Sequence, residues 1–263
     1  MSAYRYVLLD PTGNLTCLVL DPVPPEAEPA VTRELLKQCE QVAYLEPASV
    51  PGARAAIRLM GGEFCGNAAM ASAAWLLRDS LAKGEEAVFP LQVSGAEQPV
   101  DCRVLALEHG FEGTVRMPRI LEVSEEEYFG FPLIAVRMEG IRHLIYTGAF
   151  PEPGDAEFLL RRIAGILRDE AIGLMQWDRQ AGYLRPLVYV RGSGTLVWER
   201  GCGSGSAAVG AWEALRADGP ETVTDIRQPG GIIRVAAEKT DGKIVSVRIT
   251  GRILLGKEVV LQL

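Results

Sequence analysis

The chain has 263 residues, of which 48% are hydrophobic and 23% are charged, a composition typical of a globular protein with one large core or two smaller ones. Its net charge of −7 argues against nucleic-acid or anionic-membrane partners, which require a basic patch. Because no apolar run is long enough for a membrane span and the N-terminus turns acidic at Asp10, we expect a cytoplasmic protein.

The first half of the chain is expected to contain two helices among short strands. Residues 4–20 are expected to form a hairpin around the turn Pro11–Asn14. Thr32 is expected to cap a helix that runs to about Gln41. Further strands are expected at 42–45, 55–60, 87–93, 100–107 and 114–117, with an alanine-rich helix at 66–82.

The second half repeats this plan after an acidic segment, residues 119–130, which is expected to be a connector. Asp155 is expected to cap a helix to about Leu167, and a small-residue helix is expected at 203–217. Strands are expected at 132–138, 141–147, 171–177, 183–190, 194–199, 222–227, 231–237, 243–249 and 257–263.

The repeated order predicts an α+β protein built from two pseudo-symmetric domains. The first domain would comprise residues 1–122, to which the last strand, 257–263, can be added, and the second residues 123–256. In each domain a curved sheet or barrel would surround the helix of small residues.

Two short stretches, residues 62–69 and 199–206, are near copies of each other. In each, a Cys-Gly pair opens a run of small residues, and a tryptophan follows Cys65 and Cys202 at the same spacing. The five cysteines form no C-x-x-C pair and no zinc-type spacing, so neither a disulfide framework nor a metal site is expected. The other three are expected to be packing residues: Cys17, Cys39 and Cys102.

The position of Cys65 and Cys202 before predicted helices has chemical consequences. Free backbone N–H groups at a helix start lower the pKa of a thiol and bind an anion such as a carboxylate. If both loops face each other, a bound amino acid would have one sulfur on each side of Cα. A thiolate on one face would remove the α-proton while a thiol on the other returned one, which inverts the stereocentre without a cofactor.

These paired loops resemble the two catalytic loops of the diaminopimelate epimerase superfamily of cofactor-independent amino-acid racemases. The resemblance extends to Glu199–Gly201, to Gly13-Asn14 and to Gln41-Val42. It implies an active site in the cleft between the two domains, a small-molecule amino-acid substrate, no pyridoxal phosphate or other cofactor, and a homodimer.

The resemblance also assigns roles to individual residues. It implies that Cys65 and Cys202 are the acid and base. It implies that Glu199 and the Arg200 backbone hold the α-amino group. Backbone groups of four residues would bind the reacting carboxylate: Gly66, Asn67, Gly203 and Ser204. Two further residues would line the site: Asn14 and Gln41.

Departures from the epimerase bear on the substrate. The epimerase holds a second head group with several asparagines, whereas this chain has only Asn14 and Asn67. The family's Gly-Asn-Pro-His-like turn is replaced by residues 147–150, and Gly201 alone separates Arg200 from Cys202. A distal zwitterion would lack its partners. The run Gly-Gly-Glu-Phe-Cys-Gly-Asn instead resembles the histidine racemases of opine-metallophore pathways, which favours histidine as the substrate.

Other functions stay open at this point. The substrate could be diaminopimelate or another amino acid. A proton-shifting isomerase or a dehydratase could use the same fold. A non-enzymatic thiol pair could act as a redox switch or bind a soft metal ion.

Overall fold

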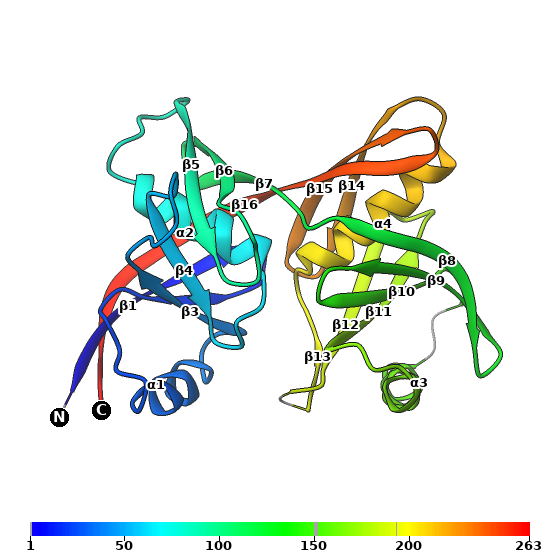
Figure 1. Ribbon diagram of the computed structural model, residues 1–263, viewed down its shortest axis with the longest axis horizontal. Helices are drawn as coiled ribbons and strands as arrows, with labels where there is room; N and C mark the ends of the chain where they lie inside the picture. The colour runs from blue at the N-terminus through cyan, green and yellow to red at the C-terminus, as the bar shows by residue number, and fades with distance from the viewer. Residues whose placement is uncertain (1, 150–151, 193) are drawn as a thin grey trace. The chain divides into compact units, whose positions relative to one another are not determined.

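The computed structural model describes residues 2–149, 152–192 and 194–263 (Figure 1). The chain divides into two compact units. Unit 1 runs to Arg116 and includes Thr250–Leu263, and unit 2 is Met117–Ile249. No helix in the described ranges is long and apolar enough to cross a membrane.

Unit 1 is a sheet that closes on itself. Its strands are hydrogen-bonded in the order β1, β2, β3, β4, β5, β6, β7 and β16, and β16 pairs with β1. Helices α1 and α2 lie in the parallel connections β2–β3 and β4–β5. The elements are β1 (Ala3–Pro11), β2 (Thr16–Val19), α1 (Glu28–Leu35), β3 (Gln41–Glu46), β4 (Ala55–Leu59), α2 (Gly66–Leu77), β5 (Glu86–Val93), β6 (Val100–Ala106), β7 (Phe111–Arg116) and β16 (Lys243–Gln262).

Helix α2 is buried on nearly all sides and packs against β1, β5, β6 and β7 (Figure 1). Its alanines let the strands approach closely, since small side chains keep the helix narrow. A methyl group on Gly113 of β7 would lie 2.7 Å from Met70 Cβ, so only glycine fits at that contact. The sequence prediction of an alanine-rich, closely packed helix is therefore confirmed.

Unit 2 likewise has strands before, between and after two helices, α3 and α4. Its strands follow the order β16, β15, β14, β12, β11, β10, β9 and β8, and β13 pairs with β12. Helices α3 and α4 lie in the parallel connections β10–β11 and β12–β14. The elements are β8 (Ile120–Tyr128), β9 (Phe131–Met138), β10 (Ile141–Tyr146), α3 (Pro153–Ile166), β11 (Ala171–Asp178), β12 (Tyr183–Val190), β13 (Thr195–Trp198), α4 (Gly203–Arg216), β14 (Glu221–Gln228) and β15 (Gly231–Thr240).

The two helices of unit 2 cover opposite faces of its sheet. Leu174 of β11 belongs to the apolar cluster formed with Leu160 and Ile163 of α3. A methyl group on Gly205 of α4 would lie 2.3 Å from the next strand residue, Met175. Because neighbouring residues of a strand point to opposite faces, α3 and α4 lie on different sides.

The α+β class predicted from the sequence is confirmed, but several expected elements differ. The first helix begins at Glu28, with Pro29 in its first turn, so Thr32 is not its cap. It ends at Leu35 and a turn follows at 36–38, which leaves Cys39 outside the helix. Asp155 lies in the first turn of α3, which begins at Pro153 with Glu152 at the cap position. Phe150 of the expected turn at 147–150 lies outside the described residues.

The expected acidic connector is wrong, because β8 occupies it and pairs with β9. Acidic residues on β8 form ion pairs across the sheet, for example Glu122 with Arg137. The expected strands 243–249 and 257–263 are one strand, β16. Along the chain the boundaries between the units fall at 116/117 and 249/250 instead of 122/123 and 256/257. The second boundary lies inside β16, where an unbroken strand offers no turn to mark it.

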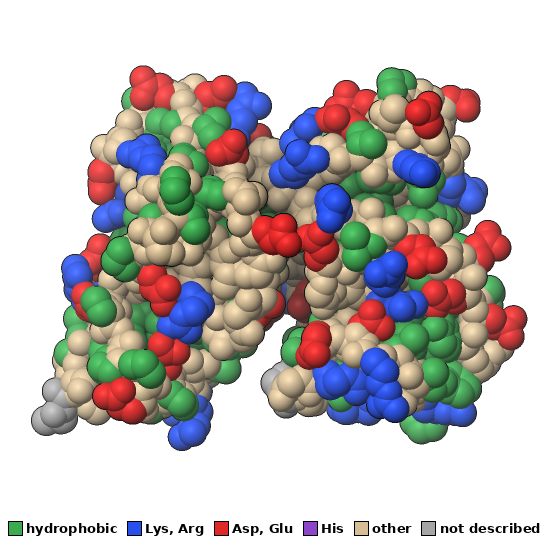
Figure 2. Space-filling model, in the orientation of Figure 1, with side chains coloured by type: hydrophobic (Ala, Val, Ile, Leu, Met, Phe, Trp, Pro, Cys, Tyr) green, Lys and Arg blue, Asp and Glu red, His purple; other side chains and the backbone are tan. Residues whose placement is uncertain are grey.

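Acidic and basic side chains are interspersed on the face shown in Figure 2. Many form exposed ion pairs, such as Lys83 with Glu108 and Arg234 with Asp225. Pairs of this kind contribute about 0–1 kcal/mol each, so the cores and not the surface charges stabilise the units.

Candidate active site

Cys65 lies at the start of α2 in unit 1, as the sequence predicted. It is the N-cap residue in extended conformation, and its Sγ accepts from the backbone N–H of Ala68 at 3.5 Å. Gly66 and Asn67 form the first turn, and both are buried. Backbone N–H groups of a first helical turn have no partner within the helix and carry partial positive charge, which favours a thiolate and a bound carboxylate.

A cluster of amide side chains surrounds Cys65. Gln41 Nε2 lies 3.3 Å from Cys65 Sγ and 2.8 Å from Asn14 Oδ1. Asn67 Nδ2 lies 3.3 Å from the same Asn14 oxygen. All three amides are buried. The structure therefore brings together Asn14, Gln41, Cys65 and Asn67, four of the residues that the sequence predicted, within unit 1.

Cys202 takes the same position at the start of α4 in unit 2. Its Sγ accepts from the backbone N–H of Gly205 at 3.3 Å and lies 3.7 Å from Ser204 Oγ. A methyl group at Gly205 would lie 3.0 Å from Cys202 Sγ and 2.3 Å from Met175 Sδ. The glycine thus leaves room for the sulfur against the helix start.

Two buried side chains that the sequence did not point to hold the Cys202 loop. Gln228 Oε1 accepts from the backbone N–H of Cys202 at 2.7 Å, and Gln228 Nε2 donates to Ser206 Oγ at 2.8 Å. Ser206 Oγ in turn donates to the Cys202 carbonyl at 2.7 Å. The ring of hydrogen bonds fixes the backbone of Cys202 from both sides.

The electrostatics of Cys202 oppose ionisation of its thiol. Burial, followed by the negative charge of the Glu199 carboxylate and a hydrogen bond with it, raises the pKa of Cys202 well above the usual range. The Gly205 N–H and Ser204 hydroxyl act in the opposite direction but are weaker. Next to Glu199, the Arg200 carbonyl accepts from Gly230 N–H at 2.7 Å, so one of its lone pairs is occupied.

None of the remaining cysteines and histidines is the N-cap residue of α2 or α4. Cys17 and Cys102 are buried in strands, and the Cys39 thiol donates to the Leu35 carbonyl at 3.2 Å. His143 is fully buried, and within the described residues neither ring nitrogen has a hydrogen-bond partner. Burial lowers the pKa of His143 to about 3. His109 is exposed in a turn.

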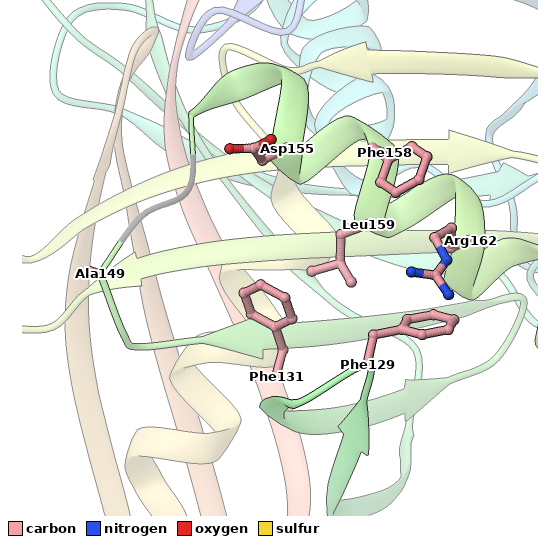
Figure 3. Close-up of a pocket in the computed structure, with 7 residues that line it drawn as sticks. All are labelled: Phe129, Phe131, Ala149, Asp155, Phe158, Leu159 and Arg162. Carbon is pink, nitrogen blue, oxygen red and sulfur yellow. The ribbon is translucent and has the colours of Figure 1, made fainter.

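A hollow of about 420 Å³ lies elsewhere in unit 2, between α3 and the turn that joins β8 to β9 (Figure 3). Phe129, Phe131 and Phe158 line it, and the Arg162 guanidinium lies 3.7 Å from the centroid of the Phe129 ring. It belongs to the α3 side of the sheet, opposite the face that carries Cys202 and α4.

Comparison with known proteins identifies the family. The sequence model described as the histidine racemase CntK N-terminal domain matches residues 3–258. The chain belongs to the histidine racemase CntK family. Membership makes it an isomerase of the racemase and epimerase type, as the sequence predicted, and confirms the predicted resemblance to histidine racemases.

Individual relatives support the same conclusion. A histidine racemase of Fusobacterium nucleatum is 27% identical over 265 residues, which cover 96% of this chain and 97% of that protein. A histidine racemase of Staphylococcus aureus is 27% identical over 254 residues, or 88% of this chain and 87% of the relative. The solved structure of a probable proline racemase from Agrobacterium radiobacter shares the fold, with a TM-score of 0.72 at 17% identity over 99% of this chain and 92% of that chain.

Proposed function

We propose that this chain is a histidine racemase that inverts Cα between two cysteines, Cys65 and Cys202, without a cofactor. The family match and the two histidine racemases at 27% identity support the substrate. One observation carries the mechanism: each cysteine is the N-cap of a largely buried helix and its sulfur accepts a backbone N–H. Diaminopimelate epimerase-like domains with a substrate cleft between them are part of the same proposal.

The chemistry follows from the two helix starts. First-turn N–H groups of Gly66, Asn67, Gly203 and Ser204 would bind the substrate carboxylate, as anions bind at helix N-termini. A thiolate on one side would remove the α-proton, and the electron pair would spread onto the carboxylate oxygens. The thiol on the other side would then protonate Cα, leaving the two cysteines with exchanged protonation states.

Further residues would orient the substrate. The Glu199 carboxylate and the free lone pair of the Arg200 carbonyl would hold the α-ammonium group, and Asn14 would line the site. In this proposal the protein is a cytoplasmic homodimer whose partner is the small-molecule amino acid.

Substrate identity is tested with purified protein and a panel of L-histidine, L-proline and LL-diaminopimelate. Chiral chromatography should find D-histidine at a far higher rate than the inverted forms of the other two. Cys65→Ser protein, prepared in the same way, controls for a contaminating racemase. Inversion of proline or diaminopimelate with no D-histidine would overturn the assignment of histidine while leaving the family intact.

A further inference from the structure

The amide cluster beside Cys65 has only one consistent set of orientations, and it begins at Glu40. Asn14 carries an amide that could present either its nitrogen or its oxygen to a neighbour. Asn14 Nδ2 lies 2.8 Å from Glu40 Oε2. Because an ionised carboxylate only accepts hydrogen bonds, the amide nitrogen must face Glu40 and the amide oxygen must face the interior.

Gln41 is oriented by what Asn14 presents. Asn14 Oδ1, 2.8 Å away, requires a donor, so Gln41 must turn its Nε2 and not its oxygen toward it. Thr16 acts in the same sense. The Thr16 hydroxyl donates its hydrogen to the backbone carbonyl of Asn14 at 3.0 Å. The hydroxyl oxygen therefore accepts from Gln41 Nε2, at 2.8 Å. The Gln41 nitrogen is thus fixed from two directions.

The same nitrogen lies 3.3 Å from Cys65 Sγ, within hydrogen-bond reach of sulfur. The amide nitrogen carries two hydrogens for three acceptors, so the sulfur shares one of the N–H groups with an oxygen acceptor. Asn14 Oδ1 lies 4.0 Å from Sγ, at the far limit for a thiol donor, and already accepts from Gln41 and Asn67. A donor facing a sulfur stabilises the thiolate over the thiol.

We propose that Gln41 is a positioning residue that presents its amide N–H to Cys65 Sγ and so makes Cys65 the base of the resting enzyme and Cys202 its acid. The division of roles rests on the proposed two-cysteine racemization. It also revises the expectation for Gln41, because its donor group serves the sulfur and not the substrate.

The surroundings of Cys202 in unit 2 favour the thiol and not the thiolate, as an acid requires. The glutamine that serves this loop, Gln228, contacts the backbone N–H of Cys202 and not the sulfur. The charge beside the sulfur is the Glu199 carboxylate, which with burial raises the pKa of Cys202. The two helix starts are therefore alike in backbone and opposite in the side chain that acts on the thiol.

Site-resolved alkylation tests the proposal. Folded wild-type protein is treated with iodoacetamide from pH 5.5 to 9.5, and peptide mass spectrometry follows Cys65 and Cys202 separately. We expect the rate at Cys65 to titrate at a lower pH than the rate at Cys202. In Gln41→Leu the midpoint pH of the Cys65 alkylation curve should rise by about one unit, and alkylation of Cys65 at pH 7 should therefore become about tenfold slower. Gln41→Glu should raise it further.

Gln92→Leu is the matched control, because Gln92 is a strand residue of the same unit whose amide contacts Ser49 and not a cysteine. It should leave both titrations unchanged, and the Cys202 titration should not move in either Gln41 variant. A Cys65 titration that is unchanged in folded Gln41→Leu would overturn the proposal. So would wild-type protein in which Cys202 titrates below Cys65, a result that needs no variant to fold.

Alkylation needs no substrate, so this outcome is separate from that of the proposed function. Protein that racemizes no amino acid but shows the Gln41-dependent Cys65 titration would remove the racemase proposal and keep the role of Gln41 toward the sulfur. Active protein whose Cys65 titration does not depend on Gln41 would keep the racemase proposal and remove the role of Gln41.

Discussion

The backbone N–H of Cys202 donates to Gln228 Oε1 over 2.7 Å, although 26 residues separate them along the chain. Gln228 ends β14, and Cys202 precedes α4. Through this contact the sheet, and not only the helix, sets the position of the second cysteine.

Gln228→Leu removes the acceptor for Cys202 and the donor to Ser206. Leaving a buried N–H unpaired costs about 1–3 kcal/mol, so we expect the free energy of unfolding in urea to fall by that amount. Racemization should fall at least tenfold, mainly in kcat, because the sulfur is displaced. Gln180→Leu, at an exposed turn position of the same unit, should match wild type. Full activity and stability in Gln228→Leu would show that the contact does not position Cys202.

Gly205→Ala should disturb the same sulfur by a different route. The added methyl would lie 2.3 Å from Met175 Sδ and 3.0 Å from Cys202 Sγ, so a buried side chain must move. We expect a loss of activity of tenfold or more, and partial recovery when Met175→Ala is added to make room. Gly165→Ala in α3 meets nothing within 4 Å, and that variant should be as active as wild type and slightly more stable.

Glu199→Gln removes the charge that, after burial, does most to raise the pKa of Cys202. The Cys202 pKa should therefore fall, and alkylation of Cys202 at pH 8 should become faster by several-fold. Racemization should nevertheless decrease if Glu199 holds the substrate ammonium. Glu170→Gln, at an exposed position of unit 2, is the comparison. Slower or unchanged alkylation of Cys202 in folded Glu199→Gln would contradict the electrostatic account.

Buried His143 predicts a pH dependence of stability. Its pKa is lowered by burial from 6.5 to about 3, so between these values the unfolded chain binds a proton that the folded chain does not. The free energy of unfolding should fall as the pH decreases below about 6.5.

The slope due to His143 should approach about 1.4 kcal/mol per pH unit near pH 5, and it should be missing from His143→Asn. The difference between wild type and variant isolates this contribution from that of the carboxyl groups. His109→Asn serves as the control, since His109 is exposed and is the only other histidine. Parallel pH profiles for wild type and His143→Asn would rule the linkage out.

Much of this organisation could be predicted from the sequence, because it is locally encoded. The Cys-Gly pairs before runs of small residues predict helix starts, and Cys65 and Cys202 are both N-caps. The alternation of strands and helices predicts the α+β class. These features depend on neighbours within a few residues.

The errors and omissions have long-range causes. The acidic composition of β8 is typical of an exposed connector. Its charges are neutralised by partners on β9, and the sequence of β8 alone does not reveal those partners. Nothing near Gln228 in the sequence indicates that its amide meets Cys202. The roles of Glu40 and Thr16 likewise depend on the register of parallel β2 and β3, which pairs Thr16 with Gln41.

The central claim is that one cysteine removes the α-proton while the other supplies a proton from solvent. It is tested most directly by following L-histidine in D₂O with wild-type, Cys65→Ser and Cys202→Ser proteins, using proton NMR for Cα and chiral chromatography for configuration. At early times wild type should yield D-histidine fully deuterated at Cα while the remaining L-histidine keeps its proton, and each serine variant should lose racemization at least a hundredfold. D-histidine that retains the α-proton, or full racemization by either variant, would contradict the account.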